Sequence, residues 1–133
     1  MPGADVIRRL IPHQGGMCLL ERVIDWNATH IRLATTTHRS PANPLRNGHR
    51  LRSVHLCEYG AQAMAVHGGL LGGSSTPRLL VSLRGVRLHA DDIDGLDGEL
   101  VVEAKRLMDS GSSWQYSFCV LHDDRLLAEG RAA

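Results

Sequence analysis

The fold of this chain is decided by residues 53–71, which read SVHLCEYGAQAMAVHGGLL. Ser53 is a favourable N-cap residue, and the glycines at 72 and 73 are typical of a helix end, so we predict one long helix between them. Its residues are apolar on most faces. A helix of this kind has to be surrounded by other elements, because a surface position would expose apolar side chains to water.

The segments on either side of this helix have the patterns of other elements. A short helix is expected at Asp5–Leu10, closed by Pro12, and residues 39–52 have the Pro, Asn, Gly and Arg content of a loop. The six expected strands are Met17–Asp25, His30–Thr37, Arg78–His89, Gly98–Met108, Trp114–Leu121 and Arg125–Arg131.

Two patterns indicate how these strands are used. Apolar side chains at the even positions of residues 114–120 share one face, as in a half-buried antiparallel strand. The alternation in Arg78–His89 changes phase at Gly85, which predicts a β-bulge and sheet curvature. We therefore predict an α+β fold in which an antiparallel sheet wraps around one central helix, as a single domain over residues 1–133.

Composition narrows the class of protein. Apolar residues make up 43% of the chain, and no run approaches the roughly 18 consecutive apolar residues of a membrane span. The N-terminal residues lack the apolar core of a secretory signal, so we expect a cytoplasmic protein. The net charge of +1 does not favour nucleic-acid binding. Because Cys18, Cys57 and Cys119 lie far apart, we expect free thiols and no metal site.

Three stretches resemble a known family. Residues 43–51, NPLRNGHRL, and residues 58–67, EYGAQAMAVH, resemble the β-hydroxyacyl-(acyl carrier protein) dehydratases, most of all their aryl polyene branch. The opening LIPH at residues 10–13 with MCLLERV at residues 17–23, and the tail LLAEGRA, are similar to the same branch. The resemblance implies a hot-dog fold, a place in fatty-acid or aryl polyene biosynthesis, and a homodimer or a heterodimer with a related subunit. It also implies a tunnel at the dimer interface, where a histidine of one chain faces an acid on the helix of the other.

Dehydration of a 3-hydroxyacyl thioester needs a base for the α-proton and an acid for the departing β-hydroxyl. Glu58, near the start of the buried helix, is the expected acid, and Gln62, four residues on, is placed to hold it. The alternative is a paired or surface glutamate. Backbone N–H groups at the helix start would receive the thioester oxygen. No cofactor is expected, because the substrate is carried on the phosphopantetheine of an acyl carrier protein.

Three histidines are candidates for the base, and the sequence does not decide among them. His49 follows the family's Gly-His placement, but the family continues Phe-Pro-Gly where this chain has Arg-Leu-Arg, and Glu58 arrives early. His38, at the end of the second strand, and His55, in the first turn of the helix, are the others. His67 is read as structural, as a cation near the C-terminal end of the helix, where a positive charge is favourable.

The loop before the helix carries Arg46, Arg50 and Arg52. Their ordinary interpretation is a solvated loop; the alternative is that they bind the phosphopantetheine phosphate or an acidic carrier protein. Two other functions fit the same fold. One is a thioesterase, in which the helical carboxylate activates water, and the other is a non-catalytic hot-dog subunit that supports an active partner.

Overall fold

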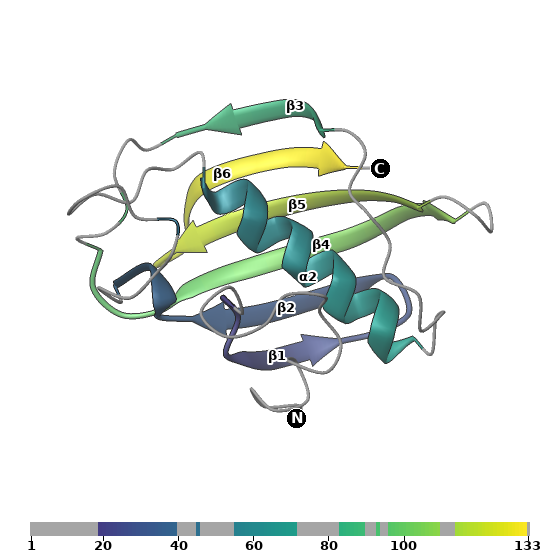
Figure 1. Cartoon of the computed structure of the whole chain (residues 1–133), viewed down its shortest axis with the longest axis horizontal. Coiled ribbons are helices and arrows are strands. Elements are labelled where there is room, and N and C mark those ends of the chain that lie inside the picture. Colours follow the sequence, from purple (N-terminus) through teal and green to yellow (C-terminus); the bar gives the residue numbers. More distant parts are fainter. Residues whose placement is uncertain are drawn as a thin grey trace.

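The computed structural model describes residues 19–39, 45, 55–71, 83–89, 93, 96–109 and 114–132. In this part of the chain, one α-helix crosses one face of a six-stranded antiparallel sheet in the order β1-β2-β4-β5-β6-β3 (Figure 1). The elements are β1 (Arg22–Trp26), β2 (His30–Thr35), the 3₁₀ turn η2 (Thr37–Arg39), α2 (Leu56–Leu70), β3 (Leu83–Leu88), β4 (Leu100–Asp109), β5 (Trp114–His122) and β6 (Arg125–Ala132).

All six predicted strands are present, and the sheet wraps around the helix as the hot-dog fold requires. β1 begins later and β2 ends earlier than predicted, and residues 78–82 of the third predicted strand lie outside the described residues. The alternation in β5 is confirmed, since Tyr116, Phe118 and Val120 are buried and Gln115 is exposed. The bulge is confirmed as well. The β3–β6 register shifts between Arg84 and Arg87, and Gly85 has a φ of 62°, a left-handed conformation that favours glycine. The short helix expected at Asp5–Leu10 lies outside the described residues.

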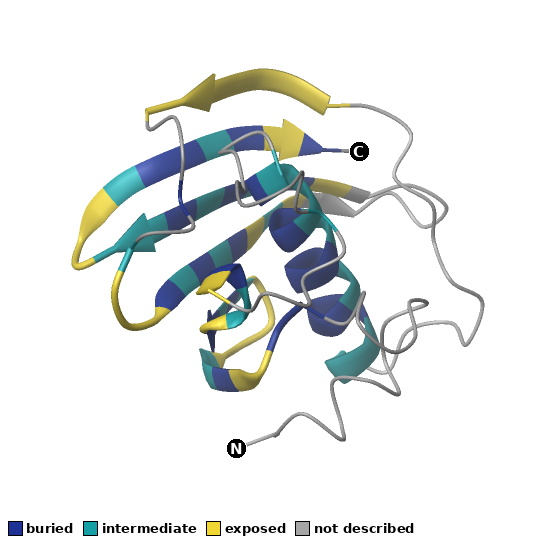
Figure 2. Cartoon of the chain, turned by 60° about the vertical axis from the view of Figure 1, so that its left-hand side comes forward, coloured by how far each residue is buried: buried dark blue, intermediate teal, exposed yellow. Residues whose placement is uncertain are grey.

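Helix α2 is buried along most of its length, as its apolar composition predicts (Figure 2). The α-helix begins at Leu56, with His55 in the N-cap position and no side-chain capping bond, and the predicted N-cap Ser53 lies outside the described residues. Gly60 allows close packing against β5, because a Cβ at that position would lie 2.5 Å from Cδ2 of Phe118. No helix among the described residues is long and apolar enough to cross a membrane.

His67 connects the end of α2 to two parts of the sheet. Its Nδ1 lies 2.7 Å from the Tyr116 hydroxyl and its Nε2 lies 2.8 Å from the carbonyl oxygen of Asn27. A carbonyl only accepts, so Nε2 carries the proton and the Tyr116 hydroxyl donates to Nδ1 of the neutral ring. Burial lowers the pKa of His67, against a smaller opposing effect of the Asn27 carbonyl. The expected structural role is supported, but the expected cation is wrong.

This depressed pKa predicts a stability that depends on pH. The pKa of His67 is about 6.5 in the unfolded chain and lower in the folded chain. Between these two values the unfolded chain binds more protons than the folded chain, so the free energy of unfolding decreases as the pH is lowered through this range. We expect His67→Gln to cost about 1–3 kcal/mol at pH 8, and less as the pH is lowered below about 6.5. Urea unfolding of both proteins across pH 5–8 measures this.

The matched control is His89→Gln, which changes a half-exposed histidine paired with Glu129. A difference between wild type and His67→Gln that stays constant across the pH range would contradict a neutral, buried His67.

Candidate active site

Glu58 lies in the first turn of α2, partly buried, and Gln62 lies one turn further on the same face. The Gln62 side-chain amide donates to Oε1 of Glu58 over 3.3 Å, and its own oxygen accepts the backbone N–H of Leu19 over 2.9 Å. Gln62 is 1% exposed, so its bond to Leu19 is buried, whereas its bond to Glu58 is partly buried. The i, i+4 spacing seen in the sequence therefore does bring the predicted acid and the predicted holding residue together.

The carbonyl oxygen of Leu19 anchors a second group of side chains. It accepts hydrogen bonds from the hydroxyls of Thr35 and Thr37, at 2.5 and 2.6 Å. The Thr37 hydroxyl also lies 3.0 Å from the hydroxyl of Tyr59, which neighbours Glu58 on α2. The backbone N–H and carbonyl of one residue, Leu19, thus tie the start of the helix to the turn that follows β2.

His38 belongs to that turn, η2, and is fully buried. Its Nε2 lies 2.8 Å from the carbonyl oxygen of Leu96. Because a carbonyl has no proton to give, Nε2 carries the hydrogen, and Nδ1 is the basic nitrogen of the neutral ring. A histidine held in this tautomer by a backbone carbonyl is oriented as a general base has to be.

The other predicted site residues are placed differently. His55 is partly buried at the N-cap of α2, and among the described residues its Nδ1 has no hydrogen-bond partner. His49, Arg46, Arg50 and Arg52 lie outside the described residues. The described structure therefore bears on Glu58, Gln62, His38 and His55 alone.

Sequence reasoning did not identify Leu19, Thr35, Thr37 and Tyr59 as parts of this arrangement. The one available signal was the run of three threonines at residues 35–37, placed where a strand gives way to a turn. Neither described cysteine has the lowered pKa that activates a nucleophilic thiol. Burial raises the pKa of Cys57, and burial together with the Glu103 carboxylate raises the pKa of Cys119 to about 12, so both are thiols at neutral pH. Among the described residues, no three His, Cys, Asp or Glu side chains converge on a possible metal position.

Comparison with known protein families identifies the family to which this chain belongs. Residues 6–133 match the ApeP-like family, described as ApeP dehydratase. A comparison with curated proteins finds no match. Solved structures of similar fold include the dehydratase heterocomplex ApeI:P from Xenorhabdus doucetiae, with 22% identity, a TM-score of 0.81, and coverage of 95% of this chain and 87% of that one.

Two further structures share the fold at lower identity. AziG from S. sahachiroi is 17% identical with a TM-score of 0.68, covering 93% of this chain and 94% of that one. Zebra fish thioesterase superfamily member 2 is 13% identical with a TM-score of 0.65, covering 97% and 91%. Structural similarity at these sequence identities establishes the hot-dog fold. The reaction has to be inferred from the residues of the candidate site.

The contact between Gln62 and Leu19 predicts a measurable local effect. Gln62→Leu keeps a side chain of similar size but removes the acceptor of the Leu19 N–H. We expect the free energy of unfolding to fall by about 1–3 kcal/mol and the Leu19 amide to exchange faster with solvent deuterium. The control is Glu58→Gln, which leaves the bond between Gln62 and Leu19 in place. Equal protection of the Leu19 amide in the two variants would contradict this account.

Proposed function

The chain belongs to the ApeP-like dehydratase family, and from that membership we propose that it removes water from a 3-hydroxyacyl thioester carried by an acyl carrier protein. The product is the trans-2-enoyl thioester, formed in the cytoplasm in a fatty-acid or aryl polyene type of biosynthesis. The observation that carries this proposal is the Leu19 backbone, whose N–H bonds to Gln62, the partner of Glu58, and whose carbonyl bonds to Thr37, the neighbour of His38. The same residue thus orders the surroundings of the acid and of the base in each chain, and the tunnel at the dimer interface would bring the acid of one chain to the base of the other.

In the proposed reaction, Nδ1 of the base histidine takes the α-proton, and electron density moves onto the thioester oxygen. His38 is the base that the described geometry favours, because its tautomer is set by Leu96; His49 is the alternative. N–H groups of the first turn of α2 receive the thioester oxygen, and His55 adds no side-chain cap there.

Glu58 completes the reaction as the acid. Its carboxylic acid gives a proton to the β-hydroxyl, the C–O bond breaks, and water leaves as the carbon–carbon double bond forms. The amide of Gln62 fixes the orientation of Glu58, since that amide is itself fixed by the Leu19 N–H. The proton on the histidine then has to return to Glu58 before the next turnover. These steps use side chains and backbone alone, and no cofactor is proposed.

Mass spectrometry of a 3-hydroxyacyl carrier-protein substrate tests this reaction. We expect wild type to release water, Glu58→Gln to lose about 10²- to 10⁴-fold in rate, and either His38→Ala or His49→Ala to lose a similar factor. Glu99→Gln, which changes an exposed carboxylate paired with Arg22, is the matched control and keeps the wild-type rate.

Other outcomes of the same experiment identify the alternatives. Release of a free thiol with no enoyl product would indicate a thioesterase. An inactive isolated chain that promotes dehydration only together with a related subunit would indicate the supporting role. Water loss that does not depend on Glu58 would overturn the proposed acid.

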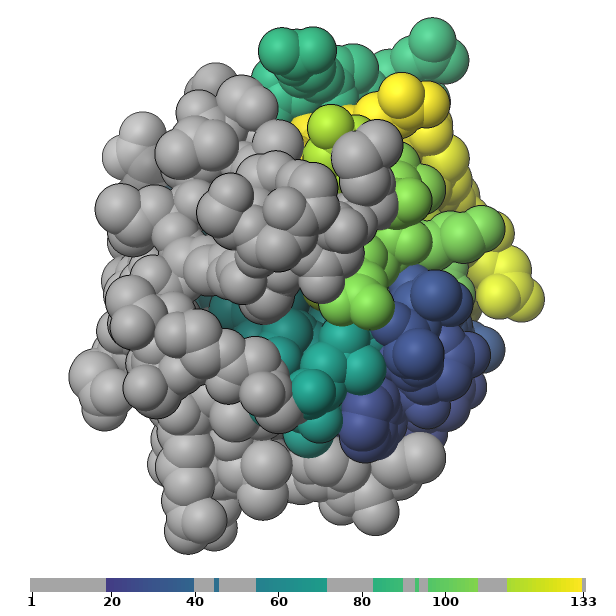
Figure 3. Space-filling model, turned by 90° about the vertical axis from the view of Figure 1, so that its right-hand side faces the viewer, coloured from purple at the N-terminus to yellow at the C-terminus, as the bar shows by residue number. Residues whose placement is uncertain are grey.

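We also place a second hot-dog subunit against β3, the strand at the end of the sheet. All six residues of β3 are exposed, and Leu83, Val86 and Leu88 are 41, 37 and 43% exposed. Figure 3 shows β3 at the rim of the described surface, beside β6. Exposed apolar side chains on an edge strand favour pairing with another strand. The partner is a second copy, or a related subunit as in the heterocomplex from Xenorhabdus doucetiae.

Charges on β3 test this placement. We expect Val86→Glu with Leu88→Lys to convert a dimer to a monomer in light scattering, because charged groups would be buried without partners. The control is Leu107→Glu on β4, at a residue 46% exposed but away from the β3 edge. If the edge variant keeps the oligomeric state of the control, the subunit contact lies elsewhere.

A further inference from the structure

The face of the sheet turned away from α2 carries charged side chains in two rows, each crossing the strands in register. The first row mixes acidic and basic side chains and contains Asp25, Arg32, Glu103, Cys119, Glu129 and Arg87. The second row contains no acid, and its members are His30, Lys105, Ser117, Arg131 and Arg84. Like charges directly opposite one another destabilise a sheet, so Arg131 beside Arg84 needs an explanation.

The bulge at Gly85 contributes to this arrangement. In a regular strand, residues three apart point to opposite faces, so Arg84 and Arg87 would diverge. The extra residue of the bulge turns both arginines to the same side, and both line one groove with Lys105 and Arg131. This groove has a volume of about 710 Å³, which is in the range of ligand sites.

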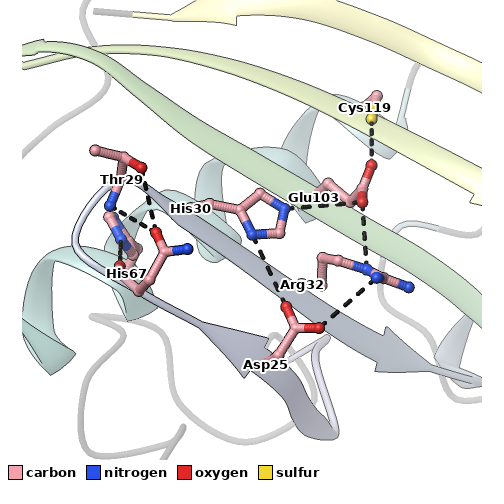
Figure 4. Close-up of polar contacts among 8 residues, drawn as sticks. Asp25, Thr29, His30, Arg32, His67, Glu103 and Cys119 are labelled. Atoms are coloured by element: carbon pink, nitrogen blue, oxygen red, sulfur yellow. Dashed lines mark hydrogen bonds and ion pairs between the residues drawn. The ribbon is translucent and has the colours of Figure 1, made fainter.

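The carboxylates of the groove already have partners. Glu103 lies 3.3 Å from Nε of Arg32 and accepts the Cys119 thiol over 3.2 Å, as Figure 4 shows. Glu129 lies 2.9 Å from Nε2 of His89.

The cations of the groove lack such partners. Within the described ranges, Arg84, Arg87, Lys105 and Arg131 form no ion pair. Among the described residues, the groove therefore has four cations without an ion-pair partner and two carboxylates that already have partners, which gives it an excess of positive charge.

From this we propose that the groove on the outer face of the sheet binds a small molecule with two or more phosphate groups. The guanidinium forks of Arg84 and Arg131 match phosphate oxygens, with Lys105 as a third positive group. Lys105 on β4 and Arg84 on β3 are three strand spacings apart, about 14 Å, so one phosphate cannot reach the whole row. The concave shape favours a small ligand over a flat protein surface. This site is separated from Glu58 and His38 by the sheet itself and is independent of the proposed dehydration.

Calorimetric titration with tripolyphosphate at constant ionic strength tests the groove. We expect saturable binding of one ion per chain, weakened at least about tenfold in Arg84→Gln with Arg131→Gln. The matched control is Arg125→Gln, an exposed arginine on β6 outside the groove, which keeps the wild-type affinity. Circular dichroism checks that all variants fold. No binding, or equal weakening in the control, would overturn the proposal.

Amide chemical shifts locate the bound ion. Tripolyphosphate should move the signals of Ser117 and Gly130, which line the groove. Shifts confined to the start of α2 would overturn the proposal, since they would assign the ion to the helix terminus. Binding of polyglutamate without binding of tripolyphosphate would also overturn it, in favour of an acidic protein.

Discussion

The rest of the structure depends on burying most of α2 without leaving its polar groups unsatisfied. An all-round apolar helix places no constraint on its own rotation, because any face can contact the core. The few polar side chains of α2 supply that constraint, since each needs a buried partner. Gln62 bonds to Leu19 ahead of β1, Tyr59 lies against Thr37 after β2, and His67 bonds to Tyr116 on β5. These three contacts fix the rotation of the helix and its position along the sheet.

The same contacts explain why the candidate site sits where it does. Two of the polar groups that orient the helix lie near Glu58: Tyr59 in the same turn and Gln62 one turn further. The turn that carries His38 is tied to them through Thr37. The contacts that stabilise the fold and those that orient the proposed catalytic groups therefore share the backbone of Leu19. A change there would disturb both packing and the geometry of the proposed acid and base.

Sequence patterns predicted the central helix, the six strands and the bulge at Gly85, because periodicity and glycine chemistry are local properties. They also predicted the Glu58–Gln62 pair, which follows from helical spacing. They did not predict the bond from Gln62 to Leu19, 43 residues away, because such contacts depend on how elements pack. His67 was taken for a cation, because the sequence does not show how deeply a side chain is buried. The two outer rows of charge required the strand register, which only the paired sheet reveals.

The crossover that brings β3 beside β6 has a consequence for synthesis on the ribosome. His89 and Glu129, which hold these strands together at one end, are 40 residues apart. At translation rates of about 5–20 residues per second, β3 is made about 2–8 s before its partner strand. During that interval β3 lacks β6, its one neighbour in the sheet, and its apolar side chains are open to other nascent chains. The subunit contact proposed at this strand would therefore have to form after β6 has been made.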